Sequence, residues 1–251
     1  MPTFTHDNVQ LFYREQGSGP LLLILPGNTA SSALHEGELA YFGQRFHAVS
    51  LDFRGTGQSD RLDEWPVDWY ETAAHDVAAL IDHLGEGQAT VMGTSGGAIV
   101  ALLLAIHHPD KVRGVIADST VEPFTRQMLN KNVIQDRARR EPAAIEFWTQ
   151  AHGDDWEAVI DADTDMLKRF VRKSRGRWSR GRLNEIACPV LLTASLEDSV
   201  LANVGRQVTR MSRQIPDSRA YFSGDGDHPL MWSRAEEFRQ VCDYFLARLY
   251  A

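Results

Sequence analysis

Short runs of apolar residues recur along this chain, separated by longer stretches in which polar and apolar positions mix. Continuous apolar runs of this kind are typical of parallel strands that are covered on both faces. An earlier segment, Val9–Glu15, alternates between apolar and polar residues and predicts an antiparallel strand at the edge of the sheet. The strands predicted from apolar runs are Leu21–Leu25, Phe46–Leu51, Val112–Ala117, Val190–Ala194 and a shorter one near Ala220–Phe222.

Between these strands, apolar residues return at helical spacing. Tyr70–Leu84 carries them every three to four positions and stops before Gly85, a residue suited to the left-handed conformation that closes many helices. Similar patterns predict a helix around Ala202–Met211 and a final helix over Arg234–Leu249. The alternation of strands and helices predicts an α/β fold built on a mostly parallel, twisted sheet flanked by helices.

The pattern changes between residues 120 and 184, which are helical in pattern, rich in arginine and lysine, and without a clear strand. We therefore expect an α/β core formed by residues 1–119 and 185–251, interrupted by a small helical cap insertion at 120–184. Charged residues such as those of Arg137–Arg140 are typical of a solvated helix face, with attraction of an anionic substrate as the alternative. Most large aromatics of the insertion are expected in its own core and a minority against a substrate; they are Phe124, Phe147, Trp148, Trp156, Phe170 and Trp178.

The segment that carries the clearest chemistry is Gly93-Thr94-Ser95-Gly96-Gly97. A short strand, Gln88–Met92, precedes it, and a helix-forming run, Ala98–Ile106, follows it. A G-x-S-x-G segment between a strand and a helix predicts a nucleophile elbow, in which a sharp turn exposes the serine hydroxyl at the end of the sheet. Ser95 is therefore the candidate nucleophile, and the glycines are expected where strand and helix approach too closely for side chains.

A serine hydroxyl becomes a good nucleophile only when a base takes its proton and a third group orients that base. Asp198 follows the strand Val190–Ala194, and His228 ends a glycine-rich loop after the last predicted strand, so the order serine, acid, histidine is met. Asp198 and His228 are therefore the candidate acid and base. Glu197, adjacent to Asp198, and Asp118, at the end of an earlier strand, remain alternatives for the acid.

Together these motifs resemble the α/β-hydrolase-fold family over essentially the whole chain. The resemblance rests on Leu25-Pro26-Gly27-Asn28, on the loop Asp52–Ser59, on the elbow, and on the loops at Asp198 and His228. Within the family, the region Trp65-Pro66-Val67-Asp68-Trp69-Tyr70 and the short insertion are most similar to the valacyclovir-hydrolase-like esterases. The resemblance implies that the backbone N–H groups of Asn28 and Gly96 form an oxyanion hole.

Two positions depart from the family pattern. Pro26 stands where family members usually have a histidine before the glycine, which puts the geometry of the oxyanion loop in question. Gly96 stands where the amino-ester enzymes have an aspartate for the substrate ammonium group. Specificity for amino-acid esters is therefore not expected of this chain.

The composition of the chain limits the kinds of partner that it is expected to bind. The net charge of −8 is opposite to the clustered basic surface that nucleic-acid binding requires. The longest apolar run, about ten residues, is too short to span a bilayer, and neither a secretory signal nor a C-x-x-C motif is visible. We expect a cytoplasmic protein that needs no cofactor or metal and acts on a small-molecule, ester-like substrate, without nucleic-acid or membrane partners.

The resemblance and the candidate triad predict a serine hydrolase of the carboxylesterase type that works through an acyl-enzyme. Lactonase, C–C-bond hydrolase and cofactor-free perhydrolase reactions use the same triad, and a slow-turnover ligand receptor would keep the same fold. These alternatives stay open at the level of the sequence.

Overall fold

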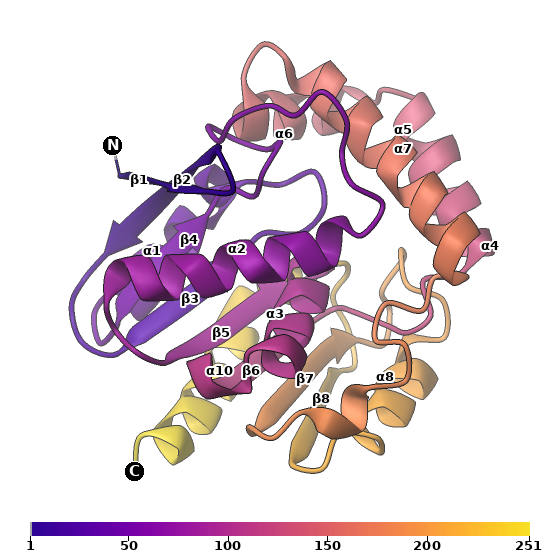
Figure 1. Cartoon of the computed structure of the whole chain (residues 1–251). Helices are drawn as coiled ribbons and strands as arrows, with labels where there is room; N and C mark the ends of the chain where they lie inside the picture. The colour runs from indigo at the N-terminus through magenta and orange to yellow at the C-terminus, as the bar shows by residue number, and fades with distance from the viewer. Residues whose placement is uncertain (1) are drawn as a thin grey trace.

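The computed structural model describes residues 2–251 and contains one eight-stranded sheet in the order β1-β2-β4-β3-β5-β6-β7-β8 (Figure 1). Strands β4, β3, β5, β6, β7 and β8 run parallel to one another, whereas β2 is antiparallel to both β1 and β4. The predicted mostly parallel sheet is confirmed. The strands are β1 (Thr3–His6), β2 (Val9–Gln16), β3 (Leu21–Leu25), β4 (His47–Leu51), β5 (Ala89–Thr94), β6 (Val112–Asp118), β7 (Val190–Ser195) and β8 (Ser218–Ser223).

The prediction that Val9–Glu15 forms the edge of the sheet is wrong. This segment lies in β2, which pairs with β4 on one side and with β1 on the other, so β1 is the edge strand. β1 has only four residues and buries only Phe4, which is why its sequence shows no clear strand pattern. By contrast, all five residues of β3 are buried, as its continuous apolar run predicts.

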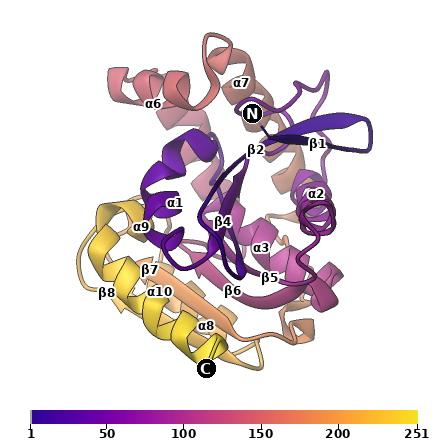
Figure 2. The ribbon, with the colours of Figure 1, turned by 90° about the vertical axis from the view of Figure 1, so that its left-hand side faces the viewer.

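Helices cover both faces of the sheet. One layer of the core joins the sheet to α2, α3 and α8, and the other joins it to α1, α9 and α10. In Figure 2, α1, α9 and α10 lie on the left of the sheet and α2 and α3 on its right. The predicted end of α2 is confirmed, since Gly85 has a φ of +72° and donates its N–H to the carbonyls of Ile81 and Asp82. The helices outside the insertion are η1 (Ser32–His35), α1 (Glu36–Phe42), α2 (Trp69–Leu84), α3 (Gly96–His107), η2 (Pro109–Lys111), α8 (Val204–Ser212), α9 (Leu230–Ser233) and α10 (Ala235–Leu249).

The segment between β6 and β7 contains helical elements and, among the residues that the structure describes, no strand. Its helices lie together above one end of the sheet (Figure 1). The exact limits of this insertion, at residues 120 and 184, stay a prediction, and we refer to residues 120–184 as the insertion. Its elements are α4 (Arg126–Met128), the π-helical η3 (Leu129–Gln135), α5 (Asp136–Ala138), α6 (Pro142–His152) and α7 (Trp156–Ser174), and η4 (Leu183–Glu185) spans its end.

The helices of residues 2–251 include none that is both long and apolar enough to cross a membrane. Cys188 and Cys242 are both free thiols. Within the same residues, no three histidine, cysteine, aspartate or glutamate side chains come together as a metal site.

Candidate active site

Ser95 occupies the sharp turn between β5 and α3. Its φ of +52° and ψ of −116° are rare for a residue with a side chain and mark local backbone strain. The turn is tight enough to require the flanking glycines, because a Cβ on Gly93 would overlap the carbonyl of Gly97 and one on Gly97 would overlap the carbonyl of Leu25. This is the close approach expected of an elbow.

Ser95, His228 and Asp198 form one hydrogen-bonded chain. The His228 Nε2 lies 3.1 Å from the Ser95 Oγ, and its Nδ1 lies 2.8 Å from the Asp198 Oδ2. A carboxylate beside Nδ1 holds the proton on that nitrogen and leaves Nε2 free to accept the serine proton. The structure therefore brings together the three residues predicted for the triad.

Two backbone N–H groups hold the Asp198 carboxylate. Its Oδ1 accepts hydrogen bonds from the N–H of Val200 at 2.9 Å and of Leu201 at 2.7 Å, and the side chain is fully buried. These bonds fix the carboxylate with its second oxygen toward His228. Glu197, the neighbouring alternative, is exposed.

Asp118, the other alternative for the acid, has no hydrogen bond to His228. Its buried carboxylate accepts from the hydroxyls of Thr94 and Thr193, at 3.1 and 2.7 Å, and from the N–H of Met231 at 3.0 Å. Burial raises its pKa to about 6. Asp118 therefore connects β5 and β7 to the segment just after His228 through hydrogen bonds and stabilises the position of that segment.

The two backbone groups predicted for the oxyanion hole lie beside each other. The Asn28 nitrogen is 3.2 Å from the position that a Cβ on Gly96 would occupy, and a Cβ on Gly27 would lie 3.2 Å from the Ser95 Cβ. Among residues 2–251, the Asn28 N–H has no hydrogen-bond acceptor. Gly96 is the first residue of α3, where backbone N–H groups are free and the helix carries a partial positive charge.

The side chain of Asn28 is held at both ends of its amide. Its Oδ1 accepts from the hydroxyl of Tyr70 at 2.8 Å, and its Nδ2 donates to the Oδ1 of Asp163 at 2.6 Å. Burial raises the pKa of Tyr70, so its hydroxyl keeps the proton that it donates. The contacts of Tyr70 and Asp163 were not predicted from the sequence, because each lies far from Asn28 along the chain.

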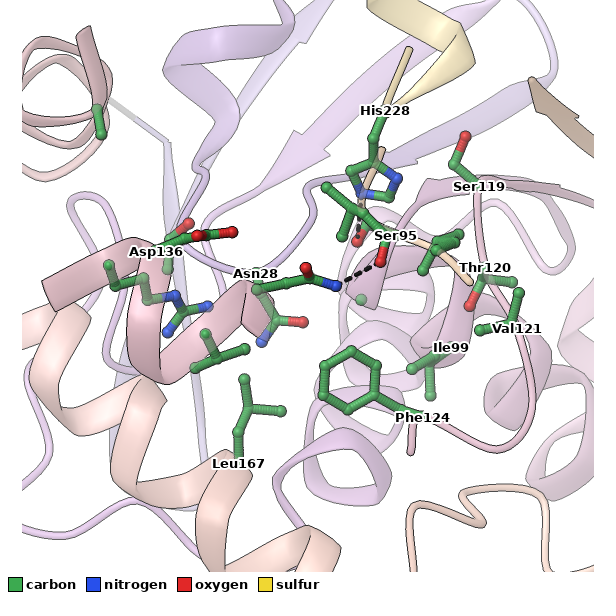
Figure 3. A pocket seen from close by; sticks show the side chains of 18 of the residues that line it. Asn28, Ser95, Ile99, Ser119, Thr120, Val121, Phe124, Asp136, Leu167 and His228 are labelled. Atoms are coloured by element: carbon green, nitrogen blue, oxygen red, sulfur yellow. Dashed lines mark hydrogen bonds between the residues drawn. The ribbon is translucent and has the colours of Figure 1, made fainter. Parts of the chain in front are cut away.

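A cavity of about 390 Å³ lies above Ser95, between the core and the insertion. Phe124, Ile99 and Val121 lie together on one side of it, and Asp136 lies on the opposite side, beyond Asn28 (Figure 3). A mostly apolar cavity of this size with a few polar groups is typical of a small-molecule site. Further apolar lining comes from Val133, Ala144, Trp148, Leu167, Val200 and Leu201.

The lining of this cavity shows where the large aromatic residues and one arginine of the insertion lie. Of its six large aromatic residues, Phe124 and Trp148 line the cavity, so the expected minority does face it. Arg137 differs from the expected solvated face, because its side chain is only 13% exposed, lines the cavity and pairs with Asp163 at 2.6 Å.

The chain is similar to several known hydrolases. A family model described as alpha/beta hydrolase fold matches residues 20–149, about half of the chain. The 3-oxoadipate enol-lactonase 2 of Acinetobacter baylyi is 33% identical over 217 residues, which cover 79% of each protein. The chain belongs to the α/β-hydrolase family, and the predicted resemblance is confirmed.

Other relatives cover different shares of the chain. The human serine hydrolase BPHL is 25% identical over 246 residues, which cover 96% of this chain and 84% of BPHL. The 2-(acetamidomethylene)succinate hydrolase of Mesorhizobium japonicum is 40% identical, but the match spans only 43% of this chain and 38% of that enzyme. A solved esterase of Thermogutta terrifontis has a TM-score of 0.78 at 20% identity, covers 99% of this chain and 97% of its own, and shares the fold.

Proposed function

We propose that this chain is a serine hydrolase that cleaves small carboxylic esters through an acyl-enzyme intermediate. The observation that carries the proposal is the chain of contacts from Ser95 through His228 to Asp198, at 3.1 and 2.8 Å, at the floor of a largely apolar cavity. The established membership in the α/β-hydrolase family supports hydrolysis as the reaction class. The particular substrate and the roles of the residues belong to the proposal.

In the first half of the proposed reaction, the Ser95 Oγ attacks the carbonyl carbon of the ester while His228 Nε2 takes the hydroxyl proton. The new C–O bond creates a tetrahedral intermediate whose oxyanion accepts hydrogen bonds from the N–H groups of Asn28 and Gly96. One such donor contributes about 2.7–4 kcal/mol to the transition state. The intermediate collapses, the C–O bond to the alcohol breaks, and the alcohol leaves with the proton from His228.

In the second half, His228 takes a proton from water, and the resulting hydroxide attacks the acyl carbon. The bond to Ser95 breaks, the serine regains its proton from His228, and the carboxylic acid leaves. Asp198 stabilises the imidazolium that forms in both halves without itself taking the proton.

The surroundings of Ser95 favour an uncharged substrate of modest size. The apolar side chains of Ile99 and Phe124 lie near Ser95, whereas the charged lining residues Asp136, Arg137, Arg139 and Glu141 come from the insertion (Figure 3). The side chain of Asn28 occupies the space next to Gly96, where a Cβ would overlap its Oδ1. A carboxylate at position 96 to receive a substrate ammonium group would displace Asn28. Esters of amino acids are therefore not the proposed substrates.

Lactone hydrolysis is the second candidate, and it is favoured by the 33% identity to an enol-lactonase over 79% of each protein. The triad would act in the same way, except that the leaving alcohol stays attached to the acyl group until water releases both. Parallel kcat/KM measurements on a γ-lactone and an open ester of matched size separate the two. A ratio above about 200 for either substrate exceeds the discrimination that one methylene typically gives.

The central test is labelling with a fluorophosphonate probe together with hydrolysis of p-nitrophenyl acetate. We expect the wild-type protein to be labelled at Ser95 and to turn over repeatedly, and the Ser95→Ala variant to do neither. Ser18→Ala, which removes an exposed hydroxyl from a loop remote from the cavity, serves as the matched control and should behave as wild type. Labelling at another residue, or a single acylation without turnover, would contradict the proposal.

A further inference from the structure

We infer that Asp163, in the insertion, is a positioning residue for the oxyanion hole and acts through the side chain of Asn28. The inference rests on the proposed function and adds to it a residue that never touches the substrate carbonyl. It means that the insertion contributes to the chemical step as well as to the shape of the cavity.

The Asp163 carboxylate is 1% exposed and makes two short polar contacts. Its Oδ1 accepts from the Nδ2 of Asn28 and its Oδ2 from the Nη1 of Arg137, both at 2.6 Å. Arg137 Nη1 also lies 2.8 Å from the hydroxyl of Thr164, which fixes the guanidinium against the same helix. With Arg137 on one oxygen of this buried carboxylate, the other oxygen is left to accept from Asn28 alone.

This bond acts on the residue whose backbone would bind the oxyanion. The amide of Asn28 is fixed at one end by Asp163 and at the other by Tyr70, and its Oδ1 packs against the first residue of α3, Gly96. Held at three points, the side chain fixes the Cα and Cβ of Asn28 beside Gly96, and the backbone on either side has less freedom to move. The free N–H of Asn28 is thereby kept in place beside Gly96.

Two further contacts from the insertion hold the same loop. His152, at the end of α6, donates its Nε2–H to the carbonyl of Thr29 at 3.1 Å, and the hydroxyl of Ser31 donates to the carbonyl of Ala151 at 2.7 Å. The loop that follows β3 is thus attached to α6 and α7 as well as to the core. These attachments occur in a chain that has Pro26 where its family usually has a histidine.

The inference is tested by steady-state hydrolysis of a p-nitrophenyl ester with Asp163→Ala. Loss of a whole oxyanion donor lowers kcat about 10²–10³-fold, so a misplaced donor should lower kcat about 10- to 100-fold. We expect KM to stay within about threefold, because the ground-state carbonyl depends little on the hole. Asp161→Asn, on the same helix but 68% exposed and paired with Arg140, is the matched control and should keep wild-type kcat.

Two readouts separate positioning from a general loss of structure. An aryl trifluoromethyl ketone, which forms a tetrahedral oxyanion on Ser95, should bind Asp163→Ala more weakly by the factor lost in kcat, whereas the corresponding methyl ketone should bind equally well. In addition, Asn28→Ala and Asp163→Ala should not be additive in kcat, because both remove one interaction. Additive effects, or a change in KM alone, would overturn the inference.

The isosteric Asp163→Asn keeps the test decisive if the alanine variant does not fold. It places an amide beside Arg137 and weakens the acceptor for Asn28, so kcat should again fall and again fail to add to Asn28→Ala. Activity equal to that of Asp161→Asn would overturn the inference. Failure of the proposed function looks different, because the wild-type protein would then show no turnover and no label on Ser95.

Discussion

His152 gives the stability of this protein a specific dependence on pH. The side chain is 6% exposed, its Nδ1 accepts from the N–H of Gly57 at 3.0 Å, and its Nε2 donates to the carbonyl of Thr29 at 3.1 Å. This pair of bonds needs the neutral ring, since a protonated Nδ1 cannot accept. Burial, together with the positive charge of Arg61, lowers the pKa of His152 from 6.5 to about 4.

The sign of the effect follows from proton linkage. Below pH 6.5 His152 is protonated in the unfolded chain, whereas in the folded protein it stays neutral until the pH falls to about 4. Acid therefore favours unfolding over this range. The contribution of His152 is complete above pH 6.5 and is lost as the pH falls toward 4. Between pH 7.5 and pH 5 the free energy of unfolding should decrease by about 2 kcal/mol on account of this group.

Urea unfolding of the wild-type protein and of His152→Gln at pH 7.5, 6.5, 5.5 and 5.0 measures the effect. Glutamine can accept from Gly57 and donate to Thr29 without titrating, so the wild type should lose about 2 kcal/mol more than the variant on acidification. Asp118 has the opposite effect, because its raised pKa makes acid stabilise the fold as the pH falls from about 6, but it is present in both proteins and cancels. Equal pH dependence of the two proteins would refute the assignment of a buried neutral His152.

Three other substitutions test the candidate triad, the elbow at Ser95 and the lining of the cavity. Asp198→Asn removes the acceptor that orients His228 and should lower kcat for p-nitrophenyl acetate about 10⁴-fold at neutral pH with the fold intact; a loss under tenfold would argue for another acid. Gly97→Ala forces a methyl group onto the carbonyl of Leu25 and should lower the free energy of unfolding by about 1–3 kcal/mol, measured by urea titration, so an unchanged value would contradict the tight elbow. Phe124→Ala enlarges the cavity and should raise kcat/KM for hexanoate relative to acetate esters about tenfold, whereas a parallel fall for both would place Phe124 outside the acyl site.

Much of the fold could be predicted because most of its parallel strands are continuous runs of apolar residues in the sequence. β3 is buried at all five positions. A strand that is covered on both faces has no exposed polar position, so its apolar run is easy to recognise in the sequence. The edge strand β1 was missed for the converse reason, because two of its four residues are exposed and its register depends on pairing with β2. The short helix α1 (Glu36–Phe42) was also missed, since seven residues give too little periodicity.

The candidate triad could be predicted because its geometry is set locally, by an elbow and by loops that follow strands of one sheet. The residues that hold the Asn28 side chain in place could not be predicted in this way. Asp163 lies 135 residues from Asn28 along the chain, in a helix whose other acidic residues are solvated, and nothing in its neighbours distinguishes it. Arg137 looked like part of a charged surface for the same reason. Such roles arise from how helices pack, and short sequence patterns do not record that packing.

The attachment of the oxyanion loop to α6 and α7 has a consequence for engineering this enzyme. A designer who exchanged the insertion for that of a relative, in order to change the substrate, would also remove Asp163 and His152 from the loop after β3. The donor insertion would bring its own cavity lining, and the Asn28 amide would keep a partner only if that insertion carried an acceptor in the place of Asp163. In the proposed mechanism, the insertion that shapes the cavity and the core that carries Ser95 are therefore not interchangeable modules, and a successful graft must carry the anchors of the loop with it.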